Sequence, residues 1–150
     1  MAGFIWAYNL SGGRELVYEF VMSDTDTLTV GDLLNIESGE VDLAIASDAD
    51  MLGPMAGASD PDDNVAGQAG RVAGTDSVTK VRATVNPDAV LTAIDLNARL
   101  AAVNLDLAGA TGAQVYTSAT QNTFLVVKDS SAVEETLSII EPGEHYLNPN

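Results

Sequence analysis

The chain has 150 residues, of which 22 are acidic and six are basic, so its formal net charge at pH 7 is −16. A field of this sign repels phosphate backbones and anionic lipids, so we expect neither nucleic acid nor a membrane as a partner. The length is that of one domain with its own core, and the lack of cysteine excludes disulfides and thiolate metal sites.

The N-terminal segment, residues 1–13, is either a first strand or an arm that docks on a neighbouring subunit. Residues 4–10 are mostly apolar, and a Ser-Gly-Gly turn follows them. Trp6 and Tyr8 suit an arm, because aromatic side chains are enriched at the centres of interfaces. As a strand, the segment would pair with a second strand at 15–22 to form a hairpin. In either case we expect residues 14–150 to form a single β-domain.

Residues 29–60 contain three short apolar runs separated by polar turns. In the middle run, residues 41–45, larger apolar residues alternate with acidic or small ones. Alternation with a period of two residues between polar turns is typical of antiparallel strands with one buried face. The pattern therefore predicts a three-stranded meander, around which we expect the rest of the chain to be organised.

A long segment of small and polar residues, 59–76, follows this meander. It contains few side chains that can build a core, so we expect an exposed and mobile loop.

The same segment contains the chain's closest match to a calcium-binding loop. Asp60, Asp62 and Asn64 have the first, third and fifth positions of such a loop. However, Val65 stands where an EF-hand needs glycine, and Arg71 stands where it needs glutamate. A solvated acidic turn is the favoured explanation of this spacing. Two further acidic pairs could join a site between loops, namely 24/26 and 48/50.

The second half of the chain consists of short β-branched runs and turns. In residues 78–85, Val81 and Ala83 face one way while Lys80 and Arg82 face the other. Strands are predicted at 78–85, 89–94, from about 103, at 113–118, 123–128 and 135–140, with one short helix at 96–102. Together, about ten strands predict an all-β fold, a small antiparallel β-barrel or β-sandwich with an extended N-terminal arm and at most one short helix.

The sequence contains no catalytic constellation. His145 is the one histidine, and no serine or cysteine nucleophile lies near it in the sequence, so a surface or interface position is expected. Zinc needs several nitrogen or sulfur ligands, which the chain lacks. With 22 carboxylates some pair always looks suggestive, but none stands in the aromatic-lined setting that sugar hydrolysis uses. We therefore expect no enzyme activity, no cofactor and no catalytic metal.

A series of short motifs runs in order through residues 28–147. They are Gly31-Asp32-Leu33, a turn at Gly39 with the strand VDLAIA, Leu52-Gly53 to Gly57, KVRATVNPDAV, residues 104–114, the strand 123–127 and Glu144-His145. In this order the motifs resemble the small head decoration, or capsid cementing, proteins of tailed viruses, whose hosts are bacteria or haloarchaea.

This resemblance implies a β-barrel-like fold, assembly into symmetric oligomers (commonly homotrimers) and binding to the outer face of the major capsid protein shell. It places the chain on the exterior of the virion, after synthesis in the host cytoplasm, and it carries over no catalytic residues. The acidic, lysine-poor composition suits high salt, where screening reduces self-repulsion, and suggests a marine or halophilic host.

Two functions stay open on the sequence. In the first, the chain is a viral structural protein whose capsid or subunit contacts are apolar residues near its two ends. These contacts are Phe4, Ile5, Trp6, Tyr8, Tyr146 and Leu147. In the second, the chain is a soluble β-domain that binds calcium or a surface glycan through the loop at 59–76.

Overall fold

A computed structural model describes residues 3–75, 78–95, 97–118, 123–132 and 134–147 of the chain. Nearly all of these residues lie in antiparallel strands and the turns between them, with one 3₁₀ turn, η1 (Pro61–Asp63), and no α-helix in the described part. The predicted all-β class is confirmed. The sheets do not close into a barrel, so a sandwich-like arrangement holds.

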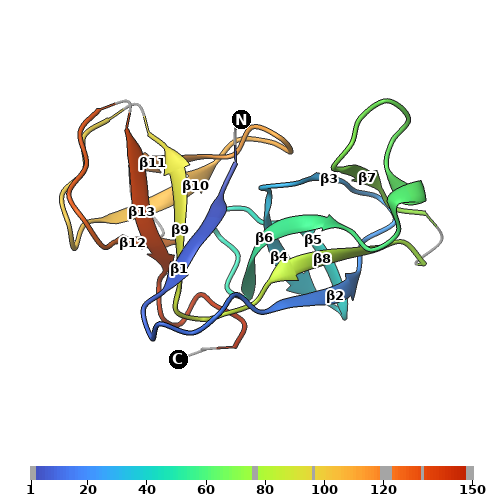
Figure 1. Cartoon of the computed structure of the whole chain (residues 1–150), viewed down its shortest axis with the longest axis horizontal. Coiled ribbons are helices and arrows are strands. Elements are labelled where there is room, and N and C mark those ends of the chain that lie inside the picture. The colour runs from blue at the N-terminus through green and yellow to red at the C-terminus, as the bar shows by residue number, and fades with distance from the viewer. Residues whose placement is uncertain (1–2, 76–77, 96, 119–122, 133, 148–150) are drawn as a thin grey trace.

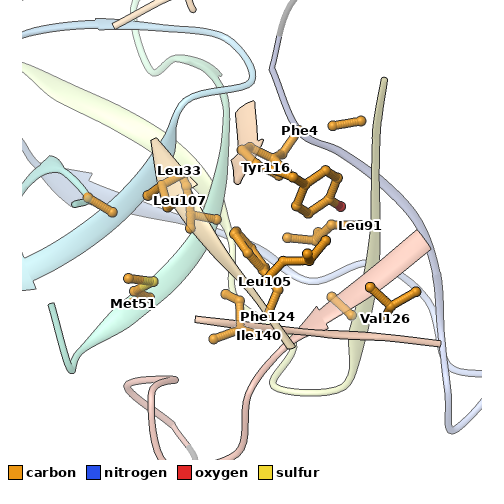
Figure 2. Packing of buried hydrophobic residues seen from close by; sticks show 13 residues of the cluster. Phe4, Leu33, Met51, Leu91, Leu105, Leu107, Tyr116, Phe124, Val126 and Ile140 are labelled. Carbon is orange, nitrogen blue, oxygen red and sulfur yellow. The ribbon is translucent and has the colours of Figure 1, made fainter. Parts of the chain in front are cut away.

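The first sheet has six strands within the described residues and lies on the left in Figure 1. Its order is β1 (Ile5–Asn9), β9 (Ala89–Ile94), β13 (Glu135–Ile140), β12 (Phe124–Val126), β10 (Asn104–Ala108) and β11 (Val115–Ser118). The rings of Phe4, Tyr116 and Phe124 meet in its core, with centroids 5.0 or 5.2 Å apart (Figure 2). Aromatic pairs at this spacing add to the stabilisation that burial alone supplies.

The second sheet has five described strands and lies on the right in Figure 1. Its order is β2 (Val17–Val21), β8 (Lys80–Thr84), β6 (Met51–Ala58), β4 (Leu33–Glu37) and β5 (Glu40–Leu43). A separate antiparallel pair, β3 (Thr27–Thr29) and β7 (Arg71–Ala73), packs Leu28 and Val72 into the core of this sheet. The described residues form two hydrophobic clusters, one centred on each sheet, and the first cluster also takes in Leu33 and Met51 from the second sheet.

Most strands lie where the sequence predicts them. β9 and β13 have the predicted bounds, 89–94 and 135–140. In β8, Val81 and Ala83 are buried while Lys80 and Arg82 are exposed, as the alternation predicts. Local patterning was sufficient for β8 because one of its faces packs on a core and the other lies outside it, whereas β9 is buried on both faces and is recognised by its continuous apolar run.

The predicted N-terminal hairpin is wrong. β1 pairs with β9 in the first sheet, whereas β2 pairs with β8 in the second. The two strands contribute to different cores, since Trp6 packs against the first core and Phe20 against the second. Between them, the Asn9 side chain donates to the carbonyls of Gly13 and Arg14 at 3.0 and 2.8 Å, so the chain crosses from sheet to sheet instead of turning back.

The predicted meander is only partly confirmed. β4 and β5 form a hairpin whose turn, Ser38 and Gly39, has φ angles of 52° and 84°, as a tight turn with two left-handed residues requires. However, β6 pairs with β4 and not with β5, so the order is β6-β4-β5. β6 is buried along most of its length and gains from a central position, whereas the acidic β5 is tolerated at the edge.

The predicted helix at 96–102 is wrong for the part that is described, residues 97–102. Arg99 forms a β-bridge with Ser130, and Ala102 has a φ of 64°, which an α-helix does not allow. The Arg99 guanidinium pairs with Asp95 at 2.7 Å. This i, i+4 spacing looks helical in the sequence, but pairing with a distant segment decides the backbone. Residue 96 lies outside the described residues.

The segment 59–76 is braced by its own side chains as far as residue 75. The Asn64 side chain donates to the Pro61 carbonyl at 2.7 Å and accepts from the Gly70 N–H at 2.9 Å. Val72 is fully buried, so the prediction that the segment contributes little to a core is wrong at β7. Its mobility stays a prediction, and residue 76 lies outside the described residues.

Candidate functional site

The predicted contacts near the N-terminus lie on or beside β1, which is an edge strand of the first sheet. Ile5 is 48% and Tyr8 45% exposed. Trp6 is half-buried, and its indole Nε1 donates to Asn9 Oδ1 at 2.9 Å. We call Ile5, Trp6 and Tyr8 the β1 surface. Residues 1–2 of the predicted arm lie outside the described residues, while β1 itself is part of the chain's own sheet.

Phe4 has to be removed from the predicted contacts. It is 1% exposed, stacks on Phe124 and meets the edge of Tyr116 in the first core (Figure 2). A side chain in this position stabilises the sheet and offers no surface to a partner.

A small cleft of about 190 Å³ adjoins the β1 surface. Its lining is mostly apolar and comes from both sheets and the segments between them. It comprises Phe4, Ile5, Trp6, Glu15, Val30, Pro54, Met55, Ala56 and Thr84. The Thr84 hydroxyl donates to Glu15 Oε1 at 2.6 Å, so the one carboxylate of this lining is already held in place.

The predicted C-terminal contacts belong to a segment, Glu144 to Leu147, that docks on the start of β6. The Met51 N–H donates to the Glu144 carbonyl at 2.9 Å, and the Tyr146 N–H donates to the Met51 carbonyl at 2.7 Å. This pairing holds the backbone while leaving Tyr146 45% and Leu147 53% exposed. Both residues are therefore available for contact, as predicted, but whether they make contact stays a prediction.

His145 is buried, whereas its place in the sequence suggested a surface or interface position. It is 1% exposed, with Nε2 2.6 Å from the Leu52 carbonyl, while Nδ1 accepts from the Leu147 N–H at 3.0 Å. Because Nδ1 is an acceptor, the proton lies on Nε2 and the ring is neutral. Burial lowers the pKa of His145 below its ordinary 6.5, although the hydrogen bond to Leu52 acts the other way. The ring thus fastens the C-terminal segment to β6.

The buried neutral ring predicts a pH dependence of stability. The unfolded chain takes up a proton on this ring as the pH falls through 6.5, whereas the folded chain does so only at lower pH. The contribution of His145 is therefore complete above pH 6.5 and decreases below it. Against His145→Gln, which does not titrate and keeps an N–H near Leu52, the wild-type advantage should fall by up to about 1.4 kcal/mol per pH unit. Urea unfolding at pH 7, 6 and 5 measures it, and a constant difference would contradict it.

Two of the sequence motifs, Gly31-Asp32-Leu33 and residues 104–114, meet in a junction between the sheets. The Asp32 carboxylate accepts from the N–H groups of Thr29 (2.8 Å) and Gly112 (2.7 Å) and from the Thr111 hydroxyl (2.5 Å). Gln114, which is 1% exposed, accepts from the Leu33 N–H at 2.5 Å. Its amide donates to the Ala44 carbonyl at 2.9 Å.

Both motifs are visible in the sequence, but the sequence does not predict that they meet, because about 80 residues separate Asp32 from Thr111 and Gly112. The only signal was a charged residue placed between a glycine and an apolar strand, and such a residue has many possible partners.

Two side-chain oxygens of the predicted calcium loop accept hydrogen bonds from the chain's own backbone. Asp60 Oδ1 accepts from the Asp62 N–H at 3.0 Å and caps η1, and Asn64 Oδ1 is taken by Gly70. The described residues contain no group of three or more His, Asp or Glu side chains that could hold a metal ion. They also contain no helix long and apolar enough to cross a membrane.

Comparisons with known proteins give little beyond this geometry. No protein-family model matches the chain, and no curated protein sequence matches it. Among solved structures, the chain is similar to the N base of the head fiber gp8.5 of bacteriophage phi29, at 17% sequence identity and a TM-score of 0.45. This match covers 84% of this chain and 95% of that one.

Proposed function

We propose that this chain is a structural protein of a tailed virus, which binds the outside of the major capsid protein shell and stabilises it as a symmetric oligomer. The observation that carries the proposal is that the motifs on which the family resemblance rests are in contact with one another. Gly31-Asp32-Leu33 and the 111–114 segment meet through hydrogen bonds of the buried Asp32 and Gln114 side chains, and His145 fixes the last motif to β6. Motifs that together build one framework are better support for a family resemblance than scattered matches.

The surface supports a role based on contact area. Ile5, Tyr8, Tyr146 and Leu147 are about half exposed although they are large and apolar. A cement works through modest contacts repeated by symmetry, which add up by avidity. With a charge of −16, the chain would favour a neutral or basic face on the capsid protein.

The proposal can be tested by co-sedimentation with purified virus particles. Deleting residues 2–12 is unsuitable, because it removes Phe4 and β1 and should unfold the first sheet. The double variant Ile5→Ser with Tyr8→Ser changes the β1 surface alone and should weaken binding at least about tenfold, as loss of an interface centre does. The matched control is Val78→Ser with Leu100→Ser, since these side chains are 70% and 67% exposed.

Equal occupancy of particles by both double variants would rule out the β1 surface as the contact. Absence of the unaltered chain from particles would refute the capsid role itself. Light scattering in solution tests the homotrimer, which predicts a mass three times the 15.6 kDa of one chain.

A further inference from the structure

β1 is the edge strand of the first sheet that lies beside the second sheet (Figure 1). Just before it, Phe4 donates its N–H to the Gly31 carbonyl at 2.8 Å, on the side away from β9. Backbone N–H and C=O groups point alternately to the two sides of a strand, so those of Trp6 point to the same side as those of Phe4. No strand of the described residues pairs with β1 on that side. The edge therefore offers a donor and an acceptor to a further strand.

The cleft of about 190 Å³ opens beside these backbone groups. Gly31 donates its N–H to the Met55 carbonyl at 3.0 Å, so this segment follows the second sheet and diverges from β1 after Phe4. Trp6 lines the cleft from β1, whereas Val30 and Met55 line it from the side of the second sheet. A free strand edge beside an apolar cleft is the arrangement by which proteins bind extended peptides, since main-chain hydrogen bonds give affinity and side-chain pockets give specificity.

The charge at the cleft favours a cationic occupant. Among the described residues that line it, Glu15 alone is charged. Its Oε1 accepts from the Thr84 hydroxyl at 2.6 Å, and a carboxylate has further lone pairs for another donor. The net charge of −16 adds a field that attracts positive groups. A second copy of this chain suits the cleft poorly, because it brings the same negative charge to it.

We propose that the β1 edge and this cleft bind an extended segment of another protein by strand addition. The segment pairs with the backbone of Trp6, places an apolar side chain in the cleft and carries a lysine or arginine that meets the Glu15 carboxylate. The inference does not rest on the capsid role, because it follows from the free edge, the lining of the cleft and the charge alone.

Titration of the full chain with blocked heptapeptides tests the site. Each peptide has the sequence Thr-Lys-Thr-X-Thr-Lys-Thr, in which threonine favours an extended backbone and X is Leu, Ile, Phe or Met. Trp6 is the one tryptophan of the chain and lines the cleft, so its fluorescence should change on binding. Hydrogen exchange of the Trp6 amide should slow at least about tenfold in the complex, because this N–H gains an acceptor.

Variants of the cleft separate this binding from general attraction to an acidic chain. Ala56→Phe fills the cleft from an exposed position of β6 and should weaken binding at least about tenfold. The matched control, Ala73→Phe, makes the same change at an exposed position of β7 and should keep the affinity. Glu15→Gln keeps an oxygen for Thr84 and should weaken binding about two- to fivefold, the effect of an exposed ion pair. Peptides with glutamine in place of lysine should not respond to Glu15→Gln.

Two further peptides carry a single N-methyl group, one at X and one at the threonine that follows X. Because N–H groups alternate between the two sides of a strand, only one of these peptides should lose binding. Equal affinities of the two methylated peptides would overturn the strand pairing. Equal affinities of Ala56→Phe and Ala73→Phe would mean general attraction of cationic peptides and would overturn the site. So would the absence of binding by every peptide at about 1 mM, where even a weak complex is half formed.

Discussion

Replacing Asp32 with alanine is expected to lower the free energy of unfolding by about 3–5 kcal/mol, a large share of the stability of a single domain. The Asp32 carboxylate is 1% exposed and accepts three hydrogen bonds, from Thr29, Thr111 and Gly112. Its removal leaves the N–H groups of Thr29 and Gly112 without this acceptor and weakens the link between the 111–114 turn and the start of β4, which Gln114 still joins through the Leu33 N–H. Hydrogen bonds to charged groups in buried positions are among the more costly ones to lose.

Urea unfolding of Asp32→Ala at pH 7 measures this loss. The matched control is Asp62→Ala, which removes the same charge from an exposed residue and should change the stability by no more than about 0.5 kcal/mol. Asp32→Asn should fall between them, since one amide oxygen can still accept while the amide N–H groups face other donors. Similar stabilities for Asp32→Ala and Asp62→Ala would show that the junction does not hold the sheets together.

Replacing Gly53 with alanine should cost about 3–5 kcal/mol, because the backbone leaves no room for a side chain there. Gly53 lies in β6 with a φ of 148°, which L-residues rarely adopt. A Cβ at this position would lie 2.2 Å from the Thr84 carbonyl oxygen, well inside van der Waals contact. Since Thr84 belongs to the neighbouring strand β8, relief of this clash would push β6 and β8 apart in the middle of the second sheet.

Gly39→Ala is the matched control for Gly53→Ala. Gly39 also has a positive φ, 84°, but no atom lies within 4 Å of its added Cβ. Only the conformational cost remains there, about 1–2 kcal/mol. Thermal or urea unfolding of the two variants separates the cost of the backbone conformation from that of the close approach. Equal losses for the two variants would contradict the packing of β6 against β8.

The candidate contacts show how far sequence reasoning reaches. Trp6, Tyr8 and Phe4 look alike in the sequence, because all three are aromatic and lie in one apolar run. In the structure Phe4 is in the core, Trp6 is half-buried and Tyr8 is 45% exposed. A bulge in the β1–β9 pairing between Trp6 and Tyr8 breaks simple alternation, so the pattern of the strand could not predict which side chains face outward.

Local patterning by itself determined the all-β class, most strand positions and the Ser38-Gly39 turn, because side-chain alternation and turn chemistry are properties of a few neighbouring residues. Strand order, the burial of His145 and the meeting of Asp32 with Thr111 were decided by tertiary structure. Each depends on contacts between segments far apart in the chain: β6 pairs beside β4, His145 packs on Leu52, and Asp32 accepts from the 111–112 turn. Such contacts follow from how two cores are filled together, and no local window contains that information.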